Sequence, residues 1–213
     1  MCNRFINAAT ADEIFAFAQA LGLDLSAASA PGGEFFPDAE VPVLRPAGAG
    51  RLGYVPLLWG LPPPPGVRGP VANIRNLQSR WWREENREFL LDPRYRCLVP
   101  FTRFAEPARG STWFAVTETP VAAFAGIWRP WHGVRRHRQA DWELFAFLTT
   151  AANGLVRPVH PQAMPAILAK PEEMALWLQG GTESLRLQRP LPDTALEIVP
   201  APPEPSSPQL SLF

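Results

Sequence analysis

Cys2 is the residue whose position suggests chemistry, because removal of Met1 would leave its α-amine and its thiol on adjacent carbons at the chain terminus. The reference pKa is about 7.7–8.0 for the amine and about 8.5 for the thiol, so a useful fraction of the amine is unprotonated near neutral pH. Such a 1,2-aminothiol forms a Schiff base with an aldehyde, and the thiol then closes a five-membered thiazolidine ring. The same residue could instead be the nucleophile of an amide hydrolysis, with its own amine as the base.

Eight short blocks, each weak by itself, follow one another in a specific order along the chain. They are Met1-Cys2-Asn3-Arg4-Phe5, Trp59-Gly60-Leu61-Pro62, Asn73-Ile74-Arg75-Asn76, Arg96-Cys97-Leu98-Val99-Pro100, Phe104-Ala105-Glu106-Pro107, Ala125-Gly126-Ile127-Trp128, Leu148-Thr149-Thr150-Ala151-Ala152-Asn153, and His160 ahead of Met164-Pro165-Ala166-Ile167-Leu168. In this order the blocks resemble the SRAP family, the SOS-response-associated peptidases that shield abasic sites. The resemblance runs from Cys2 to about residue 200.

The resemblance implies a catalytic centre of four residues. Cys2 matches the family's nucleophile, and Asn73 matches the asparagine that orients the N-terminus. Glu106 matches the proposed acid/base, and His160 matches the histidine linked to sugar-ring opening and crosslink reversal. A carboxylate and an imidazole are suited to proton transfer near pH 7, which Schiff-base formation requires.

The implied function is a covalent crosslink between Cys2 and abasic sites in single-stranded DNA, formed after autoproteolytic or aminopeptidase removal of Met1. The main alternative is an N-terminal-cysteine peptidase or amidase that acts on protein substrates. A binding module that has lost its chemistry is a third alternative, against which the retained centre argues.

Four departures from the family pattern are visible. Asn3 stands in place of the usual Gly, Asn76 stands near a position that is often acidic, and one extra residue separates His160 from Met164. The run Pro62–Pro65 replaces a second Trp. These departures leave the catalytic set intact and affect the residues expected to stack against DNA.

Grooves for single-stranded DNA combine cations for the backbone with aromatic faces for the bases. Arg80, Trp81 and Trp82 fit that composition, although a core-facing Trp pair is an equal alternative. Arg4 and Arg75 are stronger candidates because they adjoin the proposed centre. Further candidates are Arg83 and a second group formed by Arg129, Arg135, Arg136 and Arg138.

The bulk composition limits the remaining choices. The formal net charge of the 213 residues is zero, so DNA binding would need a local patch. Lys170 is the only lysine. Arginine suits phosphate because its planar fork donates two hydrogen bonds, but a GC-rich genome explains the larger share of this arginine bias. Cys2 and Cys97 are too few for a disulfide framework. With no signal peptide or membrane span visible, we expect a cytoplasmic, nucleoid-associated monomer.

Neither a metal nor a cofactor is expected. His132 and His137 have no metal-ligand spacing with either cysteine. Cys97 lies in an apolar run and is expected to be a small buried side chain.

Many short strand signals and few helices, without a βαβ rhythm, predict an α+β domain with a mostly antiparallel, barrel-like core. Thr10 and Glu13 form a capping box ahead of a helix that Gly22 can close. Further helices are predicted at about 80–90 and 171–179, and residues 26–40 are predicted to be loop. Strands are predicted within 41–59 and at 95–99, 112–117, 121–128 and 142–150.

We expect one domain over residues 1–199 and a disordered proline-rich tail over 200–213. The tail ends in Gln209-Leu210-Ser211-Leu212-Phe213, which resembles the short peptide by which bacterial replication and repair proteins bind the sliding clamp. The alternative is that these apolar residues dock on the same domain as an edge strand.

Overall fold

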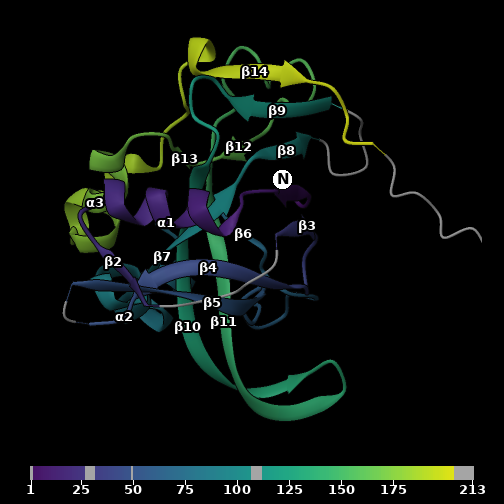
Figure 1. Cartoon of the computed structure of the whole chain (residues 1–213). Helices are drawn as coiled ribbons and strands as arrows, with labels where there is room; N and C mark the ends of the chain where they lie inside the picture. The colour runs from purple at the N-terminus through teal and green to yellow at the C-terminus, as the bar shows by residue number, and fades with distance from the viewer. Residues whose placement is uncertain (1, 27–31, 49, 107–111, 204–213) are drawn as a thin grey trace, which may run out of the picture.

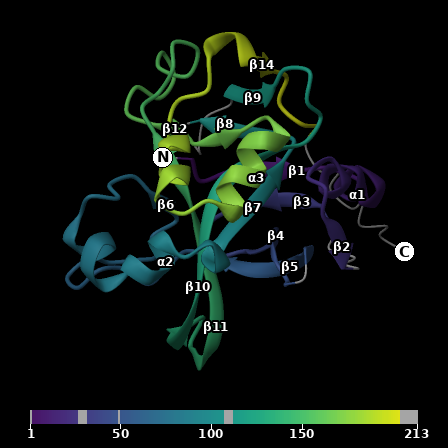
Figure 2. The same ribbon diagram turned by 90° about the vertical axis from the view of Figure 1, so that its left-hand side faces the viewer.

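The computed structural model describes residues 2–26, 32–48, 50–106 and 112–203. They form two β-sheets with three α-helices on one side, at the left in Figure 1 and facing the viewer in Figure 2. The α+β class predicted from the sequence is confirmed. No helix in these ranges is long and apolar enough to cross a membrane. The proposed clamp-binding peptide, Gln209–Phe213, lies outside the described residues.

The first sheet has five antiparallel strands and carries the start of the chain. In order across the sheet, these are β14 (Leu196–Val199), β9 (Thr112–Val116), β8 (Arg103–Glu106), β1 (Phe5–Asn7) and β3 (Gly33–Phe35). The register places Phe5 opposite both Phe35 and Phe104, so their rings share one face.

The second sheet closes on itself. Its main path is β12 (Met164–Pro165), β11 (Arg138–Thr150), β10 (Ala122–Arg135), β7 (Arg96–Phe101), β4 (Glu40–Pro46), β5 (Arg51–Trp59) and β2 (Asp24–Ser26). Strand β5 also pairs in parallel with β11, which joins five strands into a ring and gives the barrel-like core. Two short strands complete the sheet: β6 (Asn73–Ile74) pairs with β11, and β13 (Ile167–Leu168) pairs with β10.

The core has two parts because both faces of the central strands are buried. Along β11, Leu144, Ala146 and Leu148 join one cluster, while Phe145 and Phe147 join the other. The second cluster is rich in aromatic rings and also contains Phe5, Trp59, Phe104, Phe114 and Phe124 from both sheets. Its rings bury large apolar areas, so this cluster holds the N-terminal strand against the barrel.

The helices follow the sequence signals closely. Helix α1 (Ala11–Ala20) starts with the predicted capping box, and α3 (Pro171–Gln179) has the predicted bounds. The predicted helix at 80–90 is present but broken, as a π-helical turn over Trp81–Glu85 followed by α2 (Arg87–Leu91). Three short 3₁₀ helices cover Pro93–Tyr95, Thr182–Leu187 and Asp193–Ala195.

Two sequence predictions were wrong in extent. The predicted loop over 26–40 contains β3, which is held by its pairing with β1. The strands predicted at 121–128 and 142–150 are longer and form one hairpin that turns at Arg136 and His137. Both turn residues have positive φ, of 49° and 60°, a conformation usually supplied by Asn or Gly. The sequence therefore carries no turn signal at this point.

Candidate functional site

The chain start is fixed by an asparagine from the barrel. Asn73 is 8% exposed, and β6 sets its position by pairing with β11, where Asn73 lies opposite Phe147. Its Nδ2 donates to the Cys2 carbonyl at 3.0 Å and to Asn3 Oδ1 at 2.8 Å. The Trp59 indole nitrogen donates to the carbonyl of Ala72 at 2.9 Å and so holds the preceding residue.

The thiol of Cys2 is buried and protonated. The residue is 0% exposed, and its Sγ lies 3.7 Å from the carbonyl oxygen of Arg4, to which the thiol donates. Burial raises the pKa of the Cys2 thiol well above its usual range, and the negative charge of Glu106 raises it further. The protonation of Cys2 at the chain start therefore depends on the charge of Glu106 at the end of β8.

Glu106, the last residue of β8, is a buried acid with few partners. It is 0% exposed, and neither carboxylate oxygen has a hydrogen-bond partner in the described part of the chain. The imidazole Nδ1 of His160 is 3.5 Å from Glu106 Oε2. Burial raises the pKa of Glu106 to about 7, so the group can gain or lose a proton near neutral pH.

His160 is oriented by the loop between β11 and β12. Its Nδ1 lies 2.7 Å from the carbonyl oxygen of Ala163, and its backbone nitrogen donates to Val156 at 2.9 Å. A carbonyl only accepts hydrogen bonds, so this contact assigns the proton of the neutral ring to Nδ1. Nε2 is then the acceptor atom of the neutral ring.

Four separate segments thus bring together a thiol, an amide, a carboxylic acid and an imidazole. Cys2 precedes β1, Asn73 lies on β6, Glu106 ends β8, and His160 lies in the loop before β12. The arrangement can move protons around a reacting amine or thiol. No group of three or more His, Cys, Asp or Glu side chains that could hold a metal ion occurs in the described ranges.

A comparison with protein families identifies the family of this chain. The model described as SOS response associated peptidase (SRAP) matches residues 1–204. The chain belongs to the SRAP family. Membership supports a function associated with DNA damage, an enzymatic role and an interaction with DNA. A comparison with curated proteins gives no match.

Solved structures share the SRAP fold of this chain at low sequence identity. A protein from Bordetella bronchiseptica has a TM-score of 0.73 at 17% identity, covering 94% of this chain and 100% of the other. A protein from Bacteroides thetaiotaomicron has a TM-score of 0.64 at 21% identity, with 93% and 91% covered. A phage-related protein from Bordetella bronchiseptica has a TM-score of 0.64 at 19% identity, with 94% of each chain covered.

The arginines predicted beside the SRAP centre lie at its margin, and each contacts protein groups. Arg4 forms an ion pair with Glu34, and its guanidinium lies 4.9 Å from the ring centre of Trp113. Arg75 is exposed and donates to the carbonyl of Thr150. A phosphate would therefore compete with an existing carboxylate at Arg4 and with a neutral carbonyl at Arg75.

The predicted aromatic pair is divided between core and surface. Trp82 is 3% exposed and packs in the core, which is the alternative that the sequence left open. Trp81 is half-buried, with its ring centre 5.1 Å from that of Trp82. Arg80 is exposed and pairs with Glu84 at 2.7 Å, while Arg83 is exposed. Only Trp81 of the pair presents accessible ring surface.

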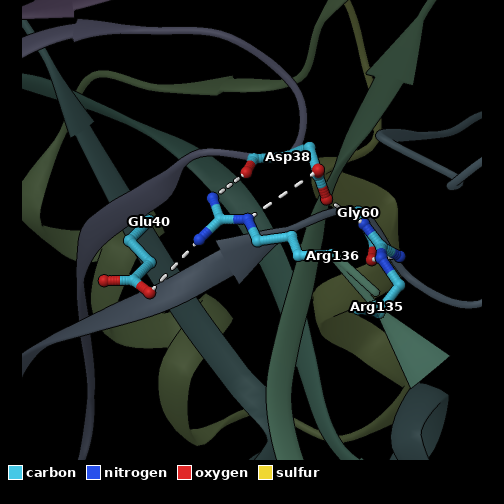
Figure 3. Close-up of polar contacts among 5 residues, drawn as sticks. All are labelled: Asp38, Glu40, Gly60, Arg135 and Arg136. Carbon is cyan, nitrogen blue, oxygen red and sulfur yellow. Dashed lines mark hydrogen bonds and ion pairs between the residues drawn. The ribbon is translucent and has the colours of Figure 1, made fainter. Parts of the chain in front are cut away.

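The second arginine group is tied to the protein itself. Arg135 Nη2 lies 2.5 Å from Asp38 Oδ1, and Nη1 donates to the carbonyl of Gly60 at 3.0 Å (Figure 3). Arg136 donates to the Asp38 carbonyl and pairs with Glu40 at 3.5 Å. These contacts fold the hairpin tip onto the turn before β4.

Arg129 lies on β10 and Arg138 on β11, and each contacts an aromatic ring. The guanidinium of Arg129 lies 4.3 Å from the ring centre of Phe89, and its Nη1 donates to Asn86 at 2.6 Å. The guanidinium of Arg138 lies 4.8 Å from the ring centre of Trp142. Both therefore have structural contacts in the absence of DNA.

Gln188 supports the site and was missed by the sequence reasoning. Its Nε2 donates to the carbonyls of Arg75 and Thr149, each at 2.9 Å, and so joins the segment after β6 to the end of β11. A single glutamine after a 3₁₀ helix has no sequence signature, so only the fold shows that it ties the chain just after Asn73 to β11.

Proposed function

We propose that this SRAP protein crosslinks covalently to abasic sites in single-stranded DNA through Cys2 once Met1 has been removed. The observation that carries the proposal is the buried cluster at the chain start. Asn73 holds the backbone of Cys2 at 3.0 Å, and a buried acid with a pKa of about 7 acts on the same thiol. An aldehyde needs an amine, a thiol and a proton-transfer group together, and this cluster supplies all three.

The reaction starts at the amine. The ring-opened abasic sugar presents an aldehyde, which the Cys2 amine attacks to give a carbinolamine. Loss of water, with a proton delivered to the departing hydroxyl, gives the imine. We assign these proton transfers to Glu106 and His160, whose carboxylate and imidazole lie 3.5 Å apart. The Oδ1 of Asn73 is buried without a partner in the described part of the chain, so it can accept a hydrogen bond from the free amine.

The second step uses the thiol. The sulfur adds to the imine carbon, the C–S bond closes the five-membered ring, and the thiol proton passes to the former imine nitrogen. The raised pKa of the Cys2 thiol keeps the sulfur protonated until this step. The same property argues against the rival function of a peptidase acting on other chains, because that chemistry needs a thiolate at the start.

The experiment is intact-mass analysis after incubation with abasic single-stranded DNA. The purified protein should lack Met1 and gain the mass of the oligonucleotide in a heat-stable adduct. Cys2→Ala keeps an α-amine but lacks the thiol, so only a reducible Schiff base should form. Cys97→Ala is the matched control, since Cys97 is also fully buried, and it should crosslink as the wild type does. An undiminished heat-stable adduct with Cys2→Ala would refute the mechanism.

We also propose that Gln209–Phe213 binds the bacterial sliding clamp. The support is the agreement of Gln, Leu, a small residue, Leu and Phe with the clamp-binding pattern, and the proline-rich tether before them. A tethered ligand raises the local concentration of the SRAP domain at replication forks. The tail peptide should bind the clamp of the same organism, and a Leu212→Ala/Phe213→Ala peptide should not. Absence of binding at about 100 μM, a free energy of only about −5.5 kcal/mol, would contradict this partner.

A further inference from the structure

Phe36 is an exposed aromatic residue beside the chain start. It follows β3, in which the neighbouring Phe35 is only 8% exposed and packs in the core, whereas Phe36 is 45% exposed. The register pairs Phe5 with Phe35, and one further step along the two strands places Phe36 opposite Arg4. The guanidinium of Arg4 lies 5.7 Å from the centre of the Phe36 ring.

On the other side of Arg4, the neighbouring strands β8 and β9 bring a second ring, that of Trp113, into contact with it. The backbone nitrogen of Ala105 donates to the Arg4 carbonyl at 3.0 Å, and Ala105 pairs with Trp113 on the next strand. Ala105 has a small side chain, which leaves room for Arg4 to reach Trp113, with the guanidinium 4.9 Å from that ring centre. Trp113 is 1% exposed. Arg4 thus lies between a buried ring and the exposed ring of Phe36.

The backbone that carries Phe36 is firmly held. Ala39 donates to the Phe36 carbonyl at 3.1 Å across a turn in which Pro37 fixes one torsion and Asp38 adopts a φ of 72°. Asp38 donates from its backbone nitrogen to the carbonyl of Trp59 at 2.8 Å. Its side chain and carbonyl are the atoms that the hairpin-tip arginines bind in Figure 3. Little conformational freedom remains to be lost when a ligand contacts this turn.

This turn also belongs to the surroundings of Cys2. Trp59, which accepts the Asp38 hydrogen bond, donates from its indole to Ala72, and the next residue, Asn73, binds the Cys2 carbonyl. The ring of Trp59 lies 5.3 Å from that of Phe5 between centres. Hydrogen bonds through Trp59 and Asn73 therefore connect the turn that carries Phe36 to the backbone of Cys2.

We propose that Phe36 stacks against the nucleobase next to the abasic site, with Arg4 contacting the phosphate of the same nucleotide. The inference rests on the proposed function, since it assigns one contact of that DNA substrate. Two observations carry it: an exposed aromatic face held in a rigid turn, and a cation in contact with that face and two residues from the nucleophile. Single-strand binding uses this combination of ring and cation. On binding, the phosphate takes the place of Glu34 as the partner of Arg4.

The test measures reversible binding to a single strand with a tetrahydrofuran abasic analogue, which cannot open to an aldehyde. One neighbouring base, on either the 5′ or the 3′ side, is replaced by fluorescent 2-aminopurine. Wild type should quench the fluorophore on one of the two sides. Phe36→Ala should remove the quenching and weaken binding about 5- to 150-fold, the range that alanine substitution of one base-stacking ring gives.

Two variants separate stacking from a structural role. Phe36→Trp keeps a flat ring and should keep both quenching and affinity, whereas Phe36→Leu keeps apolar bulk and should lose quenching. Phe15→Ala is the matched control, because Phe15 is 52% exposed on α1, and it should behave as the wild type does.

The outcomes distinguish this inference from the function on which it rests. If wild type crosslinks natural abasic DNA but Phe36→Ala retains wild-type affinity and quenching, the stacking assignment is wrong and the proposed function stands. Equal quenching by Phe36→Leu and wild type would also overturn the assignment. If wild type forms no crosslink with natural abasic DNA, the proposed function itself fails.

Discussion

Replacing Glu106 by Gln should change how stability depends on pH. In the folded protein burial raises the pKa of Glu106 from 4.5 to about 7, and the imidazole of His160 lies 3.5 Å from the carboxylate. The folded state therefore binds this proton more tightly than the unfolded state does. Between pH 4.5 and about 7 the free energy of unfolding of the wild type should fall with rising pH, because only the unfolded chain has released the proton.

The expected size follows from that interval. One pH unit corresponds to about 1.4 kcal/mol per proton, so the span from 4.5 to about 7 gives about 3 kcal/mol. Below pH 4.5 Glu106 adds no pH dependence to the free energy of unfolding, since it is protonated in both the folded and the unfolded state. Above about pH 8 it is deprotonated in both states, so the free energy of unfolding falls no further. Glu106→Gln cannot titrate, so its free energy of unfolding should lack this decrease. Any constant cost of the buried amide cancels when only the pH dependence is compared.

The assay is urea unfolding of both proteins at half-unit intervals from pH 4.5 to 8.5, with the difference in free energy plotted against pH. The difference should move by about 3 kcal/mol in favour of Glu106→Gln as pH rises. In single-turnover crosslinking the same variant should be about 10²- to 10⁴-fold slower, the usual contribution of a general acid or base. A flat difference across the whole range would show that Glu106 has an ordinary pKa and would refute the reasoning.

Three further predictions follow from the contacts of the site and of the hairpin. Asn73→Ala removes one buried and one partly buried hydrogen bond to the chain start. It should lower the free energy of unfolding in urea by about 1–3 kcal/mol and slow crosslinking, and wild-type values of both would contradict its orienting role. Arg135 and Arg136 both pair with Asp38, but the Arg135 side chain is 12% exposed and the Arg136 side chain 40% exposed. Because a buried ion pair is less screened by solvent, Arg135→Ala should lower the melting temperature more than Arg136→Ala, and the reverse order would contradict this reasoning. Arg75→Ala should reduce the slope of log binding constant against log salt concentration for single-stranded DNA by about 0.7, and equal slopes for variant and wild type would exclude a phosphate contact.

The sequence predicted the helices well because their signals are local. Thr10 and Glu13 cap α1 reciprocally, and Pro171 with Gly180 bounds α3, so each helix is specified by residues within a few positions of its ends. Strand β3 was missed because its three residues are specified by pairing with β1, almost 30 positions earlier in the chain. The break between Trp81–Glu85 and α2 was also missed, since a π-helical turn has no reliable sequence signature.

For the site, the family pattern supplied residue identities that chemistry alone would have left ambiguous. The structure brings together the four residues named from that pattern, but their roles remain predictions. What no sequence feature conveyed is the environment: the complete burial of Glu106 and Cys2, and the contact of Ala163 that selects one tautomer of His160. The pairing of Arg135 with Asp38 joins residues 97 positions apart and was equally invisible.

The closure of the barrel explains how the proposed nucleophile, Cys2, can be held in position at the start of the chain. Terminal residues usually fray because few contacts hold them. Here the parallel pairing of β5 with β11 closes the ring, and β6 pairs with the next part of β11 and so presents Asn73 to the Cys2 carbonyl. On the other side, β1 is an inner strand of the five-stranded sheet, flanked by β8 and β3. The terminus is therefore held from both sheets at once, and loss of Met1 would free a reactive amine whose backbone is already fixed.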